Sequence, residues 1–260
     1  MGNKIVSKNL VGIVPAAGVG SRLGRLPFSK ELIPILTVDP ETNQTRLQPV
    51  CMDLIGILAD SGVSHIAIAI SKDKTDILRH LGHTAHPDCR LVYVVQDETA
   101  FGLPFAIDAA YEIIRDKRVL FGMPDTIIRP RHAFQLLLAE HRASGANLVL
   151  GLFPTKTPGK YGMVGFNKAS GEINEIIDKP TATTLDRLWG IACWDGAFTD
   201  FLHEWVKKAS SVGRGEIVIG DIFAAALQHL SVKAVDIENG KFSDIGTLDE
   251  LESIALRRIE

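Results

Sequence analysis

A glycine-rich stretch followed by two cations is the part of this sequence whose residue types could do chemistry. Gly18 and Gly20 follow an apolar run, residues 10–14, that is short enough to be one buried strand. Glycine permits a sharp turn, and successive backbone N–H groups after a strand form a concavity for anions. Arg22 adds a forked cation and Lys30 a mobile one. Together these residues predict a polyphosphate site.

The glycine pattern by itself would also fit an ordinary turn, because glycine-rich turns after strands are common and short motifs produce false matches. The sequence contains no G-x-x-x-x-G-K-[ST] motif, and Leu23 stands where a dinucleotide fingerprint has its third glycine. The phosphate role is favoured by Arg22 and Lys30, which lie on the same loop and are followed by the segment Glu-Leu-Ile-Pro-Ile at 31–35.

Two carboxylates come after predicted strands. Asp125 ends the segment 121–125, and ligands of open α/β sheets bind beyond the carboxyl ends of the strands. A carboxylate at that edge suits a hard cation beside phosphates, whereas a simple turn aspartate after Pro124 is the alternative. Asp244 also follows a short strand and precedes a predicted helix, so an ordinary helix N-terminal aspartate is the alternative there.

The segments G-V-G-S-R-L (18–23) and S-K-E-L-I-P-I (29–35) resemble the signature of the sugar-phosphate nucleotidylyltransferases, the family of glucose-1-phosphate thymidylyl- and uridylyltransferases. That signature is G-x-G-T-R-L, a spacer, and P-K-x-L-x-P-[VI]. Ser21 replaces the usual threonine, and Ser29 replaces the usual proline. The spacer before Lys30 is shorter than in the common sugar enzymes and closer to that of cytidylyltransferases of small alcohol phosphates.

The resemblance continues in weaker blocks to about Glu252 and implies roles for individual residues. It implies that Arg22 and Lys30 are catalytic and that Asp125 and Asp244, the latter in a D-x-G-T block, hold Mg²⁺. It implies nucleotide binding by residues of the first block and of the segment after the third predicted strand: Ala16, Ala17, Gly18, Gly20, Ser21, Gln96 and Gly102. It implies sugar-phosphate binding by Gly162, Lys179, Gly190 and Glu216.

Two of these residues also have plainer interpretations. The amide of Gln96 offers a donor and an acceptor, which suits a uracil or thymine edge, but it would also fit an ordinary loop before a helix. Lys179 lies in an Asp-Lys-Pro block that resembles the family's E-K-P, yet most lysines are simply solvated.

Composition restricts the class of protein. The chain has 260 residues, of which 46% are hydrophobic, and a net charge of −3, so we expect neither nucleic acid nor an anionic membrane as a partner. Its three cysteines are scattered without a CxxC motif, which favours a reducing compartment. We find no signal peptide or membrane span and therefore expect a cytoplasmic protein; the sequence leaves homo-oligomer formation open.

Strands alternate with helices up to about residue 153, which predicts βαβ units. From Tyr161 onward, short strands separated by turns predict a mixed or antiparallel extension. The expected fold is α/β and Rossmann-like, with a mostly parallel central sheet, helices on both faces and a sugar-side extension of mixed strands. We expect a single domain, 1–260, with a nucleotide-binding part at roughly 9–130 and a sugar-phosphate-binding part at roughly 131–250.

The expected reaction is transfer of a nucleoside monophosphate from a nucleoside triphosphate, dTTP or UTP, to a sugar 1-phosphate, with release of pyrophosphate. One alternative is a cytidylyltransferase for a non-sugar alcohol phosphate, which the short spacer supports. The other is a nucleotide-sensing homologue without activity, and the presence of both Asp125 and Asp244 speaks against it.

Overall fold

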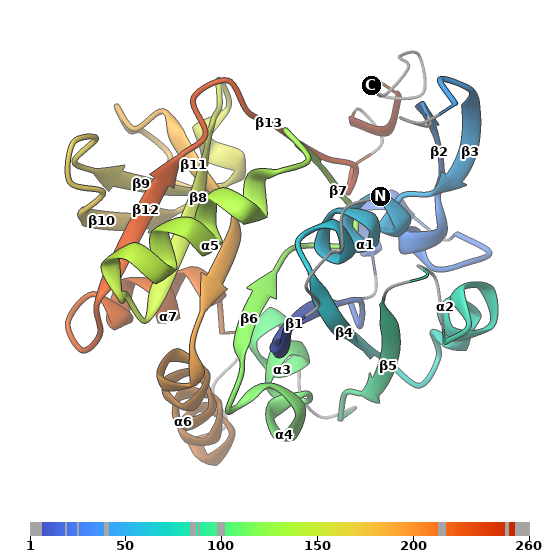
Figure 1. The fold of residues 1–260 in the computed structure, drawn as a ribbon, viewed down its shortest axis with the longest axis horizontal. Coiled ribbons are helices and arrows are strands. Elements are labelled where there is room, and N and C mark those ends of the chain that lie inside the picture. Colours follow the sequence, from blue (N-terminus) through green and yellow to red (C-terminus); the bar gives the residue numbers. More distant parts are fainter. Residues whose placement is uncertain are drawn as a thin grey trace.

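A sheet of nine strands, counted over the described residues, runs through the molecule (Figure 1). The computed structural model describes residues 7–18, 20–24, 26–38, 42–83, 87, 89–97, 102–212, 217–247 and 250–252. Seven strands follow one another in the order β10-β9-β11-β6-β1-β4-β5, and β8 pairs with β11 and β12. Their bounds are β1 (Ser7–Pro15), β4 (Val63–Ile70), β5 (Arg90–Val95), β6 (Arg118–Phe121), β8 (Leu148–Pro154), β9 (Gly162–Phe166), β10 (Ile173–Asp178), β11 (Arg187–Trp194) and β12 (Val232–Asp236).

The N-terminal part of this sheet is parallel, as expected. β1 pairs in parallel with β4 and β6, and β4 pairs in parallel with β5. β1 is buried on both faces: Leu10 and Val14 belong to one hydrophobic cluster, and Val11 and Ile13 to another. This double burial explains why β1 is a continuous apolar run rather than an alternating one.

Helices cover both faces of the sheet. The first cluster contains Leu54 of α1 and Phe134 of α5, whereas the second contains Ile107 of α3, Phe198 of α6 and Phe223 of α7. The helices are α1 (Cys51–Asp60), α2 (Thr75–Leu81), α3 (Leu103–Asp108), α4 (Tyr111–Ile114), α5 (Ala133–Ser144), α6 (Gly196–Val212) and α7 (Ile219–Ala226), with single 3-10 turns η1 (Ser21–Leu23), η2 (Lys30–Leu32) and η3 (Pro158–Lys160).

The C-terminal strands form the expected mixed extension. β11 runs antiparallel to β6, β8 and β9, β10 runs antiparallel to β9, and β12 is parallel to β8. The predicted fold class, α/β with a mostly parallel sheet and a mixed extension, is therefore confirmed. Among the described residues, no helix is both long enough and apolar enough to cross a membrane.

Two small sheets were not expected from the sequence. The polar and turn residues at 36–49 predict a loop or small excursion, but β2 (Pro34–Val38) and β3 (Thr45–Pro49) form an antiparallel pair. Ile35 and Thr37 on β2 are buried while Pro34 and Leu36 are exposed, and this alternation is hidden by the turn residues beside it. β7 (Thr126–Arg129) and β13 (Lys241–Asp244) form the second pair.

Two helix predictions also differ from the structure. The sequence pattern predicts one helix from Leu103 to Arg115, but the structure interrupts it at Ala109 and Ala110, which separate α3 from α4. The sequence also predicts a final helix from Thr247 to Ile259, most of which lies outside the described residues.

Candidate active site

The pairing of β7 with β13 brings the two predicted metal ligands together. Asp125 immediately precedes β7, and Asp244 is the last residue of β13, where it lies opposite Thr126. The backbone N–H of Ile245 donates a hydrogen bond to the Asp125 carbonyl oxygen at 2.9 Å. Figure 1 shows this strand pair between α1 and β8: β7 contacts α1, and β13 contacts β8. Two carboxylates that are far apart in the chain are thus held as neighbours by backbone hydrogen bonds.

Lys30 reaches the same place from the glycine-rich segment. It begins η2, and its Nζ donates a hydrogen bond to Asp125 Oδ2 at 2.5 Å. Gly20 has φ 71°, and a Cβ at this glycine would lie 3.2 Å from Lys30 Cδ. Glycine at position 20 therefore serves both a left-handed turn and the close passage of the lysine stem.

Arg22 completes the group. A Cβ built on Gly246 would lie 2.8 Å from Asp244 Oδ1, 3.5 Å from Arg22 Nη2 and 3.6 Å from Asp125 Oδ2. The guanidinium and both carboxylates therefore surround a single point. The structure brings together all four residues that the sequence singled out for catalysis and metal binding.

Burial and the neighbouring carboxylate favour the neutral form of Asp244. Burial and the charge of Asp125 raise the pKa of Asp244 to about 6, although the Gly246 N–H, 2.7 Å away, and Arg22 act in the opposite direction. Burial by itself would lower the pKa of Lys30, but the charge and hydrogen bond of Asp125 outweigh it, so the lysine pKa is raised. A further cation at this point would relieve the repulsion between the two carboxylates.

The donor set fits a hard divalent cation. Asp125 and Asp244 offer carboxylate oxygens, and Mg²⁺ is usually bound by one or two carboxylates together with substrate phosphates. Over the described part of the chain, no three or more His, Cys, Asp or Glu side chains are grouped closely enough to hold a metal ion by themselves. A metal at Asp125 and Asp244 would therefore be shared with a ligand.

The residues predicted to bind a nucleotide lie at the carboxyl edge of the parallel strands. The Ala16 N–H donates to the Ala69 carbonyl at 2.7 Å, and the Gln96 N–H donates to the Ile70 carbonyl at 2.8 Å. Ala17 and Gly18 follow Ala16, and a Cβ on Gly18 would meet no atom within 4 Å. Gly102, with φ 110°, precedes α3. Ser21 begins η1, but its side chain lies outside the described atoms.

The residues predicted to bind the sugar phosphate are arranged differently. Gly162 on β9 is covered by an indole, because a Cβ there would lie 2.1 Å from Trp189 Nε1. Gly190 on β11 is covered by Phe242, whose Cδ2 would lie 2.5 Å from a Cβ. Both glycines are therefore required by ring packing. Because Phe242 lies on β13, the contact with Gly190 also supports the strand that carries Asp244.

Lys179 lies on the surface. Its side chain is 61% exposed, and its Nζ lies 4.0 Å from Asp178 Oδ2. Its φ of 42° is unusual for a residue with a side chain, and its N–H donates to the Tyr161 carbonyl at 3.0 Å. The fourth predicted residue of this set, Glu216, lies outside the described residues.

Sequence reasoning missed a set of charged residues beside Lys30. Glu31 is 1% exposed, and both of its carboxylate oxygens accept hydrogen bonds from Lys74 Nζ at 2.8 Å. Ser29 is bonded to Asp76 through its N–H and its hydroxyl, each at 2.6 Å. The only sequence signal was a glutamate next to Lys30 inside an apolar segment, and nothing in the sequence indicated its partner.

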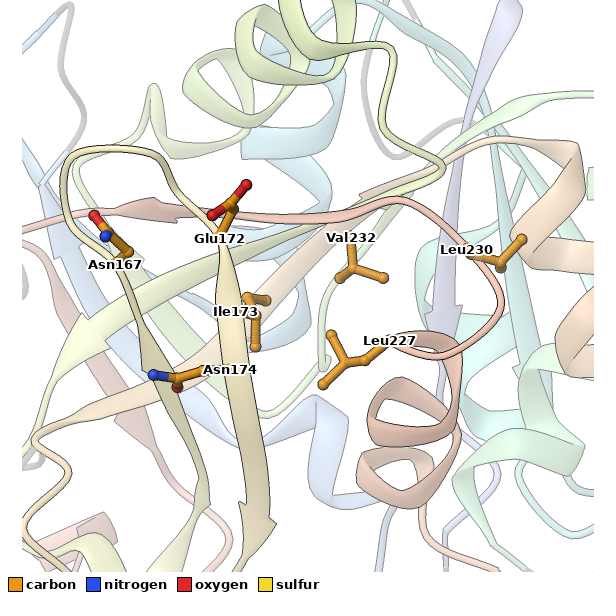
Figure 2. A pocket seen from close by; sticks show the side chains of 7 residues that line it. All are labelled: Asn167, Glu172, Ile173, Asn174, Leu227, Leu230 and Val232. Atoms are coloured by element: carbon orange, nitrogen blue, oxygen red, sulfur yellow. The ribbon is translucent and has the colours of Figure 1, made fainter.

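Two cavities differ in their relation to these residues. One, of about 460 Å³, adjoins the site and is lined by Gly20, Lys30 and Lys74 among others. The other, also about 460 Å³, lies between the β9–β10 turn and the segment from Leu227 to Val232 (Figure 2). The second cavity shares no residue with the predicted site.

The comparisons with known proteins agree with this geometry. Residues 11–259 match the family model described as "Nucleotidyl transferase". Among solved structures, the chain is similar to a Bacillus anthracis protein provisionally described as a glucose-1-phosphate thymidylyltransferase, in complex with sucrose. That match has a TM-score of 0.79 and 21% identity, and it covers 95% of this chain and 94% of the other. A comparison with curated proteins finds no match. The extent of the family match, together with the glycine-rich loop and its cations beside two carboxylates, shows that this chain belongs to the nucleotidyl transferase family of enzymes.

Proposed function

We propose that this enzyme transfers a nucleoside monophosphate from dTTP or UTP to a sugar 1-phosphate and releases pyrophosphate. The observation that carries the proposal is that Arg22, Asp125 and Asp244 surround one point, with Lys30 bonded to Asp125. Two cations and two acids around one point suit a triphosphate and its metal ion. The sugar-phosphate substrate is supported by the description of the structural relative.

In the proposed reaction, a phosphate oxygen of the sugar 1-phosphate attacks the α-phosphorus of the triphosphate. A new P–O bond forms, the bond from the α-phosphorus to the oxygen shared with the β-phosphate breaks, and that oxygen leaves with its electron pair as part of pyrophosphate. Arg22 and Lys30 neutralise the triphosphate and the charge that develops on the leaving group. Mg²⁺ at Asp125 and Asp244 would supply further neutralisation and a template for the phosphates.

The remaining residues are proposed to bind the two substrates. Ala16, Ala17, Gly18, Gly20 and Ser21 approach the phosphates, and Gln96 and Gly102 contact the base. Lys179 aligns the attacking phosphate, while Gly162, Gly190 and Glu216 border the sugar. This assigns roughly 9–130 to the nucleotide and 131–250 to the sugar phosphate, within one domain.

The test is a pyrophosphate-release assay in which each nucleoside triphosphate is paired with a panel of sugar 1-phosphates, with Mg²⁺ or with a chelator. We expect release with dTTP or UTP only when both Mg²⁺ and a sugar 1-phosphate are present. Thermal-shift measurements with the same nucleotides show binding independently of turnover. Binding of a nucleotide without release from any pair would contradict the proposal, and it would favour a nucleotide-sensing protein if CTP with an alcohol phosphate also gave no release.

The second candidate is a cytidylyltransferase acting on a non-sugar alcohol phosphate. It is favoured by one observation, the short spacer between Leu23 and Lys30. CTP would then outcompete dTTP and UTP in the same assay, and release would require an alcohol phosphate in place of the sugar 1-phosphate.

A further inference from the structure

The residues on either side of Lys30 are both attached to the start of α2. On one side, the Ser29 N–H and hydroxyl donate to the two carboxylate oxygens of Asp76, at 2.6 Å each. On the other side, Glu31 accepts two hydrogen bonds at 2.8 Å from Lys74, the residue that precedes α2. We call Lys74 and Asp76 the α2 clamp. It holds both neighbours of Lys30 in place.

The turn that carries Lys30 has little support of its own. η2 is a single 3-10 turn, Lys30–Leu32, and Ser29, the residue before it, makes no side-chain capping bond to the turn. Short 3-10 turns have poor hydrogen-bond geometry and are rarely stable alone. The cavity of about 460 Å³ is lined by Ser29 and Lys30 of the turn and by Lys74 and Asp76, so the turn and the α2 clamp border the same space. The bonds to the α2 clamp therefore supply the side-chain support that the turn does not make within itself.

The ion pair between Glu31 and Lys74 is costly for a merely structural contact. Glu31 is 1% exposed and Lys74 is 8% exposed, so both charges are removed from water. Removing a charge from water costs several kcal/mol, and well-packed apolar side chains often give equal or greater stability. The pair instead fixes the orientation of the turn, because the Glu31 carboxylate is bonded through both of its oxygens.

That orientation determines where the lysine points. Glu31 extends to Lys74, while the preceding Lys30 extends to Asp125 at 2.5 Å. With the clamp holding Ser29 and Glu31, Lys30 Nζ is kept at the point shared with Arg22 and Asp244. A displacement of about 1 Å in such a group can lower the rate about 100-fold.

We propose that Lys74 and Asp76 are positioning residues for the transfer reaction, which hold Lys30 against the metal-binding carboxylates without contacting substrate. This inference rests on the proposed function for its kinetic consequence. Its structural part, the restraint of Lys30, holds whichever nucleotide and acceptor the enzyme uses.

The kinetic test uses Asp76→Ala and the double variant Glu31→Met/Lys74→Met. The double variant removes both buried charges together, so no unpaired charge remains to unfold the protein. For both, we expect kcat to fall about 10- to 100-fold with less than a threefold change in the KM of the sugar 1-phosphate, while the melting temperature stays within a few degrees of wild type. The single variant Lys74→Arg retains the positive charge beside Glu31 and should therefore keep most of the wild-type kcat.

A matched control is Asp195→Ala. Asp195 also accepts backbone N–H bonds at the start of a helix, from Ala197 at 3.0 Å and Phe198 at 3.3 Å, but it lies at the start of α6. Its loss should affect stability as much as Asp76→Ala and leave kcat unchanged. Equal kcat losses in the two variants would overturn the proposal, because the effect would then be one of stability.

A second readout does not need turnover. The rate at which acetic anhydride labels Lys30, measured by peptide mass spectrometry, should rise severalfold in Asp76→Ala and in the double variant and stay at the wild-type level in Asp195→Ala. Unchanged labelling and unchanged kcat in an active enzyme would reject the clamp and leave the proposed function intact. An inactive wild type with faster Lys30 labelling in the variants would reject the proposed function and support the clamp.

Discussion

The two predicted halves of the site differ in how the structure uses their residues. In the nucleotide half, Lys30 bonds directly to Asp125 and Arg22 lies beside them, and the β7–β13 pairing adds Asp244 from the C-terminal part of the chain. In the sugar-phosphate half, Gly162 and Gly190 lie under aromatic rings, and Lys179 extends into solvent with its side chain 61% exposed. The first half is a cluster of charged side chains around one point, whereas in the second the glycines satisfy the packing of the protein itself.

This contrast has a physical cause. Opposite charges attract over several ångströms and, once buried, require partners, so the two cations are held beside the carboxylates that the β7–β13 pairing brings together. Glycines exert no such attraction, and the space beside them is filled by whichever side chain packs best. A glycine in a motif therefore marks a position that another group approaches closely. At Gly162 and Gly190 that group is an aromatic ring of the protein itself.

The largest expected effect is the loss of a cation from the nucleotide half. Arg22→Ala and Lys30→Ala should each lower turnover by about two orders of magnitude or more, the scale observed when a charge partner of a transition state is removed. Steady-state pyrophosphate release measures this, with Lys207→Ala as the control, because Lys207 is an exposed lysine on α6. Turnover within a few-fold of wild type in both variants would show that the charged cluster of the nucleotide half does not carry the reaction.

The next effect concerns the glycines under the rings. Gly162→Ala places a methyl group 2.1 Å from Trp189 Nε1 and should destabilise the fold by about 1–3 kcal/mol, as overpacking does. Trp189→Phe, which removes an indole N–H that has no partner among the described residues, should restore much of that stability. Urea unfolding measures both. Unaltered stability together with a raised KM for the sugar 1-phosphate would contradict the packing role and leave Gly162 only its proposed role beside the sugar.

A smaller effect is expected at Lys179. Its left-handed backbone, φ 42°, is tolerated best by asparagine, so Lys179→Asn removes the charge without straining the turn. We expect the KM for the sugar 1-phosphate to rise about tenfold, equivalent to roughly 1.4 kcal/mol, with the KM for the nucleotide unchanged. An equal rise in both constants would show that the two halves do not divide the substrates as proposed.

The smallest effect is a pH-dependent change in stability at Asp244. Its pKa is raised to about 6 by burial and by Asp125, so the folded protein is most stable while this group is protonated and loses that stability as pH rises through 6. Without divalent metal at pH 8, Asp244→Asn should melt roughly 2–4 °C above wild type, and the difference should shrink as pH falls from 6 towards 3.8, the ordinary pKa of an aspartate. Added Mg²⁺ should stabilise only the wild type. Thermal melts between pH 8 and pH 4 measure both, and a difference as large at pH 4 as at pH 8 would contradict the assignment.

Much of the fold and of the charged site follows from local patterns. The apolar run of β1, the alternation of strands and helices and the short strands after Tyr161 predicted the sheet and its mixed extension, which the structure confirms. Gly18, Gly20, Arg22 and Lys30 were identifiable because phosphate chemistry requires these residue types close together along the chain. Asp125 was identifiable from its place just after a buried strand.

Other features could not be read locally. The β2–β3 pair was missed because its turn residues dominate the segment, and β7 was missed because a four-residue strand has too little periodicity to recognise. The bond from Ser29 to Asp76 and the ion pair from Glu31 to Lys74 join segments separated by more than 40 residues, for which the sequence carries no spacing rule.

By itself, the sequence determined which chemical groups this protein can bring to a phosphate: a turn of glycines, two cations and carboxylates that follow strands. Only the tertiary structure decided that these groups share one point, because the β7–β13 hydrogen bonds place Asp244 beside Asp125. The tertiary structure alone also decided that residues at the start of α2 bond to both neighbours of Lys30, and that aromatic rings occupy the space beside Gly162 and Gly190. Side-chain types can be recognised from a short stretch of sequence. Contacts between distant segments form only when burial and backbone pairing are satisfied across the whole chain.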